Sequence, residues 1–245
     1  MKNLNNRNVL AVIWDYDGTI ADTREKNYNV SKKIVTKILK KDPTKIPALS
    51  SLNNYHQAHV KSTNWREFYA SSFNLKDDQI NEAGKLWTEY QLKDRTKIQI
   101  FAGVAETIFE LNKLPQGIVS QNSKTIIKNN LDENNLLSYF DEIIGYEQVD
   151  LKRQKPYPDG LLMCVEKLTD SKTGWVLYIG DHETDVQCAV NANNILSKNK
   201  MEIKIISIGA FYGFSVDTSG WSVLPDYEIK SADKIIEIVD NFKNY

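Results

Sequence analysis

Two aspartates, Asp15 and Asp17, lie two residues apart directly after a short apolar run, Val9–Trp14. Two carboxylates this close to a buried segment are costly unless a cation or a proton compensates their charge. Gly18 follows them and permits a tight turn. A lone Asp-x-Asp pattern is more often a solvated loop, but the buried run in front of it favours a site that binds a cation or carries a proton.

A second pair of aspartates, Asp181 and Asp185, follows another apolar run at 176–179. If the two runs form neighbouring strands of a parallel sheet, their carboxyl ends meet at one edge, and Asp15, Asp17 and Asp181 converge there. Carboxylate oxygens without a His or Cys partner suit Mg²⁺ better than a transition metal. The sequence therefore predicts a magnesium site at this edge of the sheet.

A hydroxyl, two amides and a lysine could bind a phosphoryl group beside that metal. Ser120 ends a third apolar run, and Gln121 and Asn122 open a predicted helix. The N-terminus of a helix attracts anions through its free N–H groups and its dipole. Lys155 precedes Pro156 at the start of another helix, where its ammonium can be held in a fixed direction. A nucleophile, a metal and these donors are what phosphoryl transfer requires.

The elements that must position these residues alternate between short apolar runs and helix-like stretches. Such runs indicate strands buried on both faces, and the alternation is typical of βαβ units on a parallel sheet. The predicted strands are 9–14, 117–120, 143–144, 176–179, 204–208 and 227–229. The predicted helices between them are 102–114, 123–134, 158–169, 183–194 and 231–242.

One long stretch breaks this alternation, because its periodicity is helical and it contains no convincing strand. Within it, 65–73 and 79–92 are among the predicted helices. Helices placed directly after the first strand indicate a domain inserted into the α/β core. The predicted core is therefore 1–21 with 96–245, and the predicted inserted domain is 22–95.

The composition argues against several classes of function. Lys and Arg number 31 against 32 Asp and Glu, and a net charge of −1 attracts neither nucleic acid nor a membrane surface. No apolar run reaches the roughly 20 residues of a transmembrane helix, and the polar N-terminus lacks a signal-peptide pattern. Cys164 and Cys188 are isolated, which favours a reducing compartment. We therefore expect a cytoplasmic protein without a nucleic-acid or membrane partner. We also expect a monomer or homodimer.

The ordered motifs are Asp-x-Asp-Gly-Thr, Ser after a strand, Lys-Pro, and Gly-Asp-x-x-x-Asp. This order resembles the haloacid dehalogenase superfamily of phosphohydrolases over nearly the whole chain. The long helical insertion resembles its capped members, typified by phosphoglycolate phosphatase and β-phosphoglucomutase. The resemblance implies an α/β fold, a Rossmann-like doubly wound parallel sheet core with an inserted α-helical cap domain. It also implies a Mg²⁺-dependent phosphatase acting on a small phosphorylated metabolite.

The same resemblance implies a role for each motif residue. Asp15 is expected to be the nucleophile that becomes an aspartyl phosphate and a metal ligand. Asp17 is expected to be the general acid and base and to offer its backbone carbonyl to Mg²⁺, and Asp181 to complete the metal shell. The phosphate-binding residues are expected to be Ser120, Gln121 and Lys155, of which Lys155 also counts as catalytic, with support from Thr19 and Asp185.

Two alternatives remain open at this point. A phosphomutase of the same cap class would return the phosphoryl group to a sugar instead of to water. A non-catalytic binding protein would use the fold without the reaction, although intact Asp15, Asp17, Lys155 and Asp181 count against it. Within the cap, Arg66 is the candidate for substrate specificity, because a guanidinium suits bidentate recognition of an anion.

Overall fold

The chain passes twice between two units in the computed structural model. The α/β unit contains the described residues of 1–21 and 100–245, and the helical unit is Asp22–Gln99. Two short strands, β2 (Ala21–Asp22) and β3 (Gln99–Ile100), pair with each other where the chain crosses. The structure describes residues 8–170, 173–214 and 216–243.

The sheet of the α/β unit has six parallel strands in the order β5-β4-β1-β6-β7-β8. β1 lies inside the sheet, and its residues 11–14 are completely buried, as expected for an apolar strand covered on both faces. The parallel sheet predicted from the short apolar runs is therefore confirmed. The strands are β1 (Val9–Trp14), β4 (Gln116–Val119), β5 (Glu142–Ile144), β6 (Thr173–Gly180), β7 (Glu202–Ala210) and β8 (Tyr227–Ile229).

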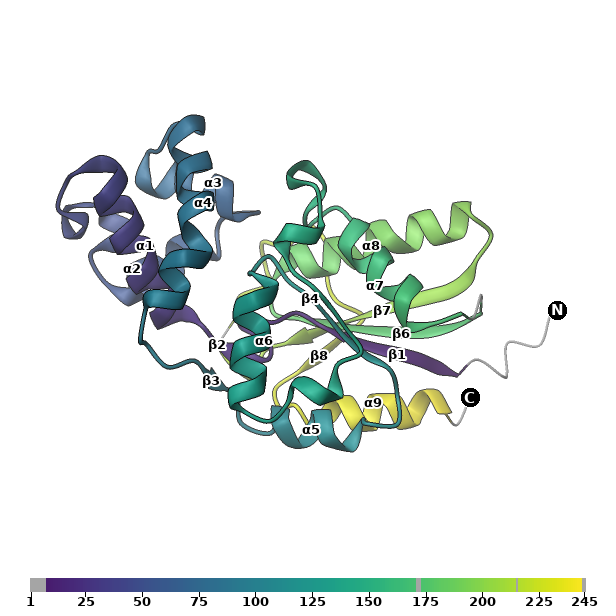
Figure 1. Ribbon diagram of the computed structural model, residues 1–245. Coiled ribbons are helices and arrows are strands. Elements are labelled where there is room, and N and C mark those ends of the chain that lie inside the picture. Colours follow the sequence, from purple (N-terminus) through teal and green to yellow (C-terminus); the bar gives the residue numbers. More distant parts are fainter. Residues whose placement is uncertain (1–7, 171–172, 215, 244–245) are drawn as a thin grey trace. The chain divides into compact units, whose positions relative to one another are not determined.

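Helices cover both faces of this sheet, with α7 and α8 on one face and α5 and α9 on the other (Figure 1). Buried side chains of α7 and α8, including the free thiols of Cys164 and Cys188, form one core cluster with the sheet. The Rossmann-like doubly wound core is confirmed. None of the described helices is both long and apolar enough to span a membrane. The helices of this unit are α5 (Val104–Glu110), α6 (Lys124–Glu133), α7 (Asp159–Leu168), α8 (Glu183–Lys198) and α9 (Lys234–Lys243).

The helical unit packs its helices around a core of aromatic rings. Phe68 lies edge-on to Tyr55 at 5.1 Å and to Phe73 at 4.9 Å between ring centroids. Its second helix was not predicted, because only Tyr55 is buried along it and most of its other residues are polar. Ser51 starts that helix by accepting a hydrogen bond from the N–H of Asn54. The helices are α1 (Arg24–Leu39), α2 (Leu52–His59), α3 (Trp65–Phe73) and α4 (Asp77–Lys93), with short 3₁₀ turns at Pro43–Lys45 and Pro47–Leu49.

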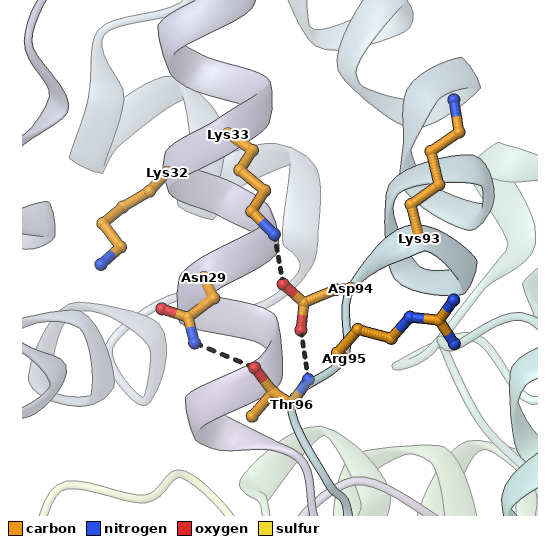
Figure 2. Close-up of a pocket in the computed structure, with 7 residues that line it drawn as sticks. All are labelled: Asn29, Lys32, Lys33, Lys93, Asp94, Arg95 and Thr96. Atoms are coloured by element: carbon orange, nitrogen blue, oxygen red, sulfur yellow. Dashed lines mark hydrogen bonds and ion pairs between the residues drawn. The ribbon is translucent and has the colours of Figure 1, made fainter.

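Residues 94–96, which we call the strap, fasten the chain that leaves α4 to the side of α1 (Figure 2). Lys33 donates from Nζ to Oδ2 of Asp94 at 2.6 Å, and Asn29 donates from Nδ2 to Oγ1 of Thr96 at 3.0 Å. Lys26 donates to the carbonyl of Asp94 at 2.9 Å. The sequence placed the boundary of the inserted domain after residue 95, where the helical periodicity ends. The helical unit extends to residue 99. Bonds from α1 hold the first residues beyond α4, 94–96, within it.

Candidate active site

Asp15 continues directly from β1 at the carboxyl edge of the sheet. Its N–H donates to the carbonyl of Ile179 on β6 at 2.7 Å. Trp14 pairs with Ile179 on that side and with Ile118 of β4 on the other. The two strands predicted to be neighbours are therefore adjacent, and the residues that follow β4 and β6 flank Asp15.

Three carboxylates gather at this edge around one lysine. Asp15, Asp181 and Asp185 each offer an oxygen within 4.8 Å of the others. The ammonium of Lys155 donates to Oδ1 of Asp15 at 2.6 Å and to Oδ1 of Asp185 at 2.7 Å. Lys155, Asp15 and Asp185 are almost completely buried. One cation therefore serves two buried carboxylates, and the third, Asp181, is bonded to a hydroxyl.

Two glycines allow the carboxylates to come this close to the backbone. Gly18 has a φ of +85°, and a Cβ at this position would lie 2.3 Å from Oδ2 of Asp181. A Cβ at Gly180 would lie 2.4 Å from Oδ2 of Asp185. Any side chain at either position would displace a carboxylate, so the glycines belong to the geometry of the site.

The electrostatics of the cluster favour an added cation. The pKa of Asp15 is raised to about 7, chiefly by burial, with Asp185 and Asp17 also raising it and Lys155 lowering it. Burial, Asp15 and Asp185 raise the pKa of Asp181 well above its usual value. Burial alone would lower the pKa of Lys155, but the two carboxylates raise it. The clustered donors are all carboxylate oxygens, so a hard divalent cation fits this site.

Hydroxyl groups and a backbone amide orient two of the three carboxylates. Thr19 is completely buried and donates from Oγ1 to Oδ1 of Asp181 at 3.2 Å. Asp185 accepts from the hydroxyl of Tyr178 at 2.9 Å and from the N–H of His182 at 3.2 Å. The sequence analysis missed Tyr178, although a tyrosine in a buried strand needs a partner for its hydroxyl and could have been noticed for that reason.

Asp17 lies against the residues that follow β4. Ser120 donates from Oγ to Oδ2 of Asp17 at 3.3 Å, and Asn122 donates from Nδ2 to Oδ1 at 3.0 Å. Gln121 donates from Nε2 to the carbonyl of Lys155 at 2.9 Å. This bond links the loop that begins at Ser120, which we call the serine loop, to the loop that contains Lys155, which we call the lysine loop. The sequence analysis named Asn122 only as an amide at the start of the helix after Ser120 and gave it no role of its own. Its position two after Ser120 was visible in the sequence, but its contact with Asp17 was not.

Arg66 lies within the helical unit on α3. Its Nη1 donates to Oδ1 of Asn81 on α4 at 2.9 Å, and its guanidinium lies over the ring of Trp65 at 5.3 Å. These contacts hold the side chain inside its own unit. The role of Arg66 in substrate specificity stays a prediction.

A basic pocket of about 430 Å³ lies beside the strap. The side chains of Lys32, Lys93 and Arg95 extend from it in different directions, whereas Lys33 is turned toward Asp94 (Figure 2). The separated cations do not converge on a common point. The pocket therefore lacks the arrangement of donors that the aspartate cluster has.

The family model described as haloacid dehalogenase-like hydrolase matches residues 12–195. The chain belongs to this family. The matched range includes the first aspartate pair, the serine loop, the lysine loop and the second aspartate pair.

Relatives of this haloacid dehalogenase-like hydrolase include two named phosphatases. A phosphoglycolate phosphatase of Shigella boydii serotype 4 (strain Sb227) is 28% identical over 142 residues, covering 57% of this chain and 51% of that protein. The chain thus spans about half the length of this curated relative. The pyrophosphatase PpaX of Listeria monocytogenes serotype 4a (strain HCC23) is 24% identical over 199 residues, covering 80% of this chain and 85% of that protein.

Solved structures share the fold with low sequence identity. A predicted phosphatase from Clostridium acetobutylicum has a TM-score of 0.73 and 19% identity, and the match covers 96% of this chain and 99% of that one. At this identity the likeness shows the fold alone.

Proposed function

We propose that this haloacid dehalogenase-like hydrolase is a Mg²⁺-dependent phosphatase acting on a small phosphorylated metabolite, phosphoglycolate-like or a sugar phosphate. The reaction passes through an aspartyl phosphate on Asp15. The observation that carries the proposal is the ammonium of Lys155, 2.6 Å from Asp15 among clustered carboxylates. Such a lysine can neutralise a phosphoryl oxygen next to the attacking carboxylate, as phosphoryl transfer requires.

In the first half-reaction the carboxylate of Asp15 attacks phosphorus. The bond from phosphorus to the Asp15 oxygen forms, and the ester bond breaks. Asp17 gives its proton to the leaving oxygen, which departs as an alcohol. Lys155 and Ser120 hold the phosphoryl oxygens in place during the transfer.

In the second half-reaction Asp17 acts as a base. Its carboxylate takes a proton from a water molecule while the water oxygen attacks phosphorus. The bond between phosphorus and Asp15 breaks, inorganic phosphate leaves, and Asp17 is protonated again. Both half-reactions therefore depend on the carboxyl group of Asp17.

Asp15 and Asp181 would hold the Mg²⁺ together with the backbone carbonyl of Asp17, and Asp185 would support them. A bound Mg²⁺ would offset the negative charge of the phosphoryl group among these carboxylates. Thr19 keeps Asp181 in its present orientation through the bond from its hydroxyl. The assignment of Mg²⁺ rests on the all-oxygen donor set.

The test is phosphate release from a panel that contains 2-phosphoglycolate, several sugar phosphates and pyrophosphate. Pyrophosphate is included because the PpaX relative matches most of this chain. We expect release from at least one compound with Mg²⁺ and none with Asp15→Asn. A sugar phosphate that is isomerised without phosphate release would favour the phosphomutase, and no turnover of any compound would favour the binding protein.

Arg66→Ala tests the proposed specificity residue in the same assay. We expect a higher KM for the best metabolite and an unchanged KM for 4-nitrophenyl phosphate, because a small aryl ester lacks the group that Arg66 would bind. Equal effects on both substrates would make Arg66 a structural residue through Asn81. The cytoplasmic location, the monomer or homodimer, and the lack of nucleic-acid and membrane partners stay predictions.

A further inference from the structure

Asn122 is a buried amide whose polar groups all have a partner. Only 2% of the residue is exposed. Its N–H donates to Oγ of Ser120 at 3.0 Å, and its carbonyl accepts from the N–H of Tyr146 at 3.0 Å. Both backbone groups are therefore anchored, and the side chain projects from a fixed point.

The orientation of the side-chain amide follows from its neighbours. The N–H of Ser123 lies 2.7 Å from Oδ1 of Asn122. A backbone N–H can only donate, so the atom that faces it must be the amide oxygen. The amide nitrogen then points the other way, to Oδ1 of Asp17 at 3.0 Å. The amide therefore presents a donor to the carboxylate, and a flipped amide would lose both bonds.

We propose that Asn122 is a positioning residue that assigns separate tasks to the two oxygens of Asp17. Its donor holds Oδ1 and so fixes the direction in which Oδ2 points. Oδ2 accepts from the hydroxyl of Ser120 at 3.3 Å, and Ser120 is one of the proposed phosphate-binding residues. Oδ2 is thus the atom that gives the proton to the leaving oxygen and later takes one from water. This inference rests on the proposed phosphatase function.

The hydrogen bond from Asn122 to Asp17 serves both half-reactions without change. An N–H donor can bond Oδ1 when Asp17 is protonated on Oδ2 and also when it is ionised. The carboxyl group therefore does not need to turn between its acid role and its base role. Loss of the donor lets the group rotate, and the cost falls on steps in which proton transfer matters.

The test compares benzyl phosphate with 4-nitrophenyl phosphate, two esters of similar shape. The benzyl alkoxide needs a proton to leave, whereas nitrophenolate leaves without one. We expect Asn122→Ala to lower kcat/KM about 30-fold for benzyl phosphate and less than about threefold for the nitrophenyl ester. Asn122→Asp should show the same pattern, because it keeps the acceptor for Ser123 and loses the donor to Asp17.

Asn193→Ala is the matched control. Asn193 bonds the N–H and carbonyl of Ile205 on β7, away from the aspartate cluster. We expect its ratio of kcat/KM between the two esters to equal that of the wild type.

Equal losses on both esters in the Asn122 variants, or loss of the folded state in both, would make Asn122 a structural residue and overturn the inference. If the Asn122 variants behave in this way and the wild type is active, the proposed phosphatase function is unaffected. A wild type that releases phosphate from neither these esters nor the metabolite panel would overturn the proposed function as well.

Discussion

Each unit contains a buried aspartate that bonds a lysine at the same distance. The pKa of one aspartate is raised, and the pKa of the other is lowered. Asp15 lies 2.6 Å from Nζ of Lys155 in the α/β unit, and Asp94 lies 2.6 Å from Nζ of Lys33 in the strap. The two residues are 7% and 6% exposed. Burial raises the pKa of Asp15 to about 7 despite Lys155. Burial also acts to raise the pKa of Asp94, but bonds from Lys33 and Thr96 hold it below its usual value.

The difference comes from the deeper burial of the Asp15 pair and from the charges around each pair. Lys155 is shared between two carboxylates, whereas Asp94 accepts from Lys33 and also from the N–H of Thr96 at 2.9 Å. The side chain of Lys33 is 53% exposed to water, and that of Lys155 only 6%. The negative charge of Asp94 in the strap is thus compensated by its partners, and the contact is structural. The aspartate cluster keeps an excess of negative charge that a cation and a reaction can use.

The largest expected effect is on activity when the metal is removed. We expect a chelator to lower phosphate release at least about 100-fold, because the clustered carboxylates would repel the phosphoryl group. Added Mg²⁺ should restore activity, and Ca²⁺ should not, since its larger shell would misplace Asp15. Asp94→Asn serves as control, because the strap holds no such cluster and its metal requirement should equal that of the wild type. Full activity in chelator would show that the aspartate cluster needs no metal. Asp15 would then not differ from Asp94 in binding a cation.

Removal of each lysine should separate the two pairs by stability. Lys155→Met leaves two buried carboxylates without their cation, and we expect a loss of about 3–5 kcal/mol in the free energy of unfolding. Lys33→Met removes a half-exposed partner, and we expect a loss of at most about 1 kcal/mol. Urea unfolding in chelator measures both. Similar losses would show that the two pairs are equivalent.

Removal of one charge should change stability in opposite directions in the two units. Asp181→Asn relieves repulsion in the metal-free cluster and keeps the acceptor for Thr19, so we expect a gain of about 1 kcal/mol in chelator at neutral pH. Asp94→Asn removes the charge that Lys33 bonds, so we expect a loss of about 1 kcal/mol. A loss in both variants would contradict an excess of negative charge at the site.

The smallest expected effect is the pH dependence of the strap. The pKa of Asp94 is lowered in the folded state, so the carboxylate stabilises the fold above the ordinary aspartate pKa of about 3.9. This contribution is lost as the pH falls through the lowered value. We therefore expect the difference in unfolding free energy between wild type and Asp94→Asn to be constant near neutral pH and to shrink in acid. A difference that grows in acid would reverse the sign assigned here.

Much of the α/β unit could be predicted from local signals. Short apolar runs such as β1 and β6 mark buried strands, and their alternation with helices gives the parallel sheet. The strand predicted at 227–229 has the same bounds in the structure, whereas α8 runs on to Lys198 because Leu196 extends its buried face. Helix α2 was missed, since its polar sequence becomes helical through capping by Ser51 and burial of Tyr55.

The site could be predicted as far as topology determines it. Asp15 and Asp181 follow neighbouring strands, so their proximity needs only the strand order. The bond from Lys155 to Asp185 depends on where the lysine loop crosses the edge of the sheet, which no local pattern gives. The amide of Asn122 is oriented by the N–H of the next residue, and the strap by side chains of α1 about sixty residues earlier in the chain. The contact of Asn122 with Asp17 and the contacts of the strap are tertiary and could not be read from spacing.

The most direct test of the central claim is rapid quenching with radiolabelled 4-nitrophenyl phosphate in the presence of Mg²⁺. Asp17→Asn should accumulate label on Asp15, because the aryl group leaves without a proton but the phosphoenzyme then lacks its base. Peptide mapping of the quenched protein should place the label on Asp15, and Asp15→Asn should carry none. Label on the Asp15→Asn protein, or turnover by Asp17→Asn at the wild-type rate, would contradict a phosphatase that works through Asp15 and Asp17.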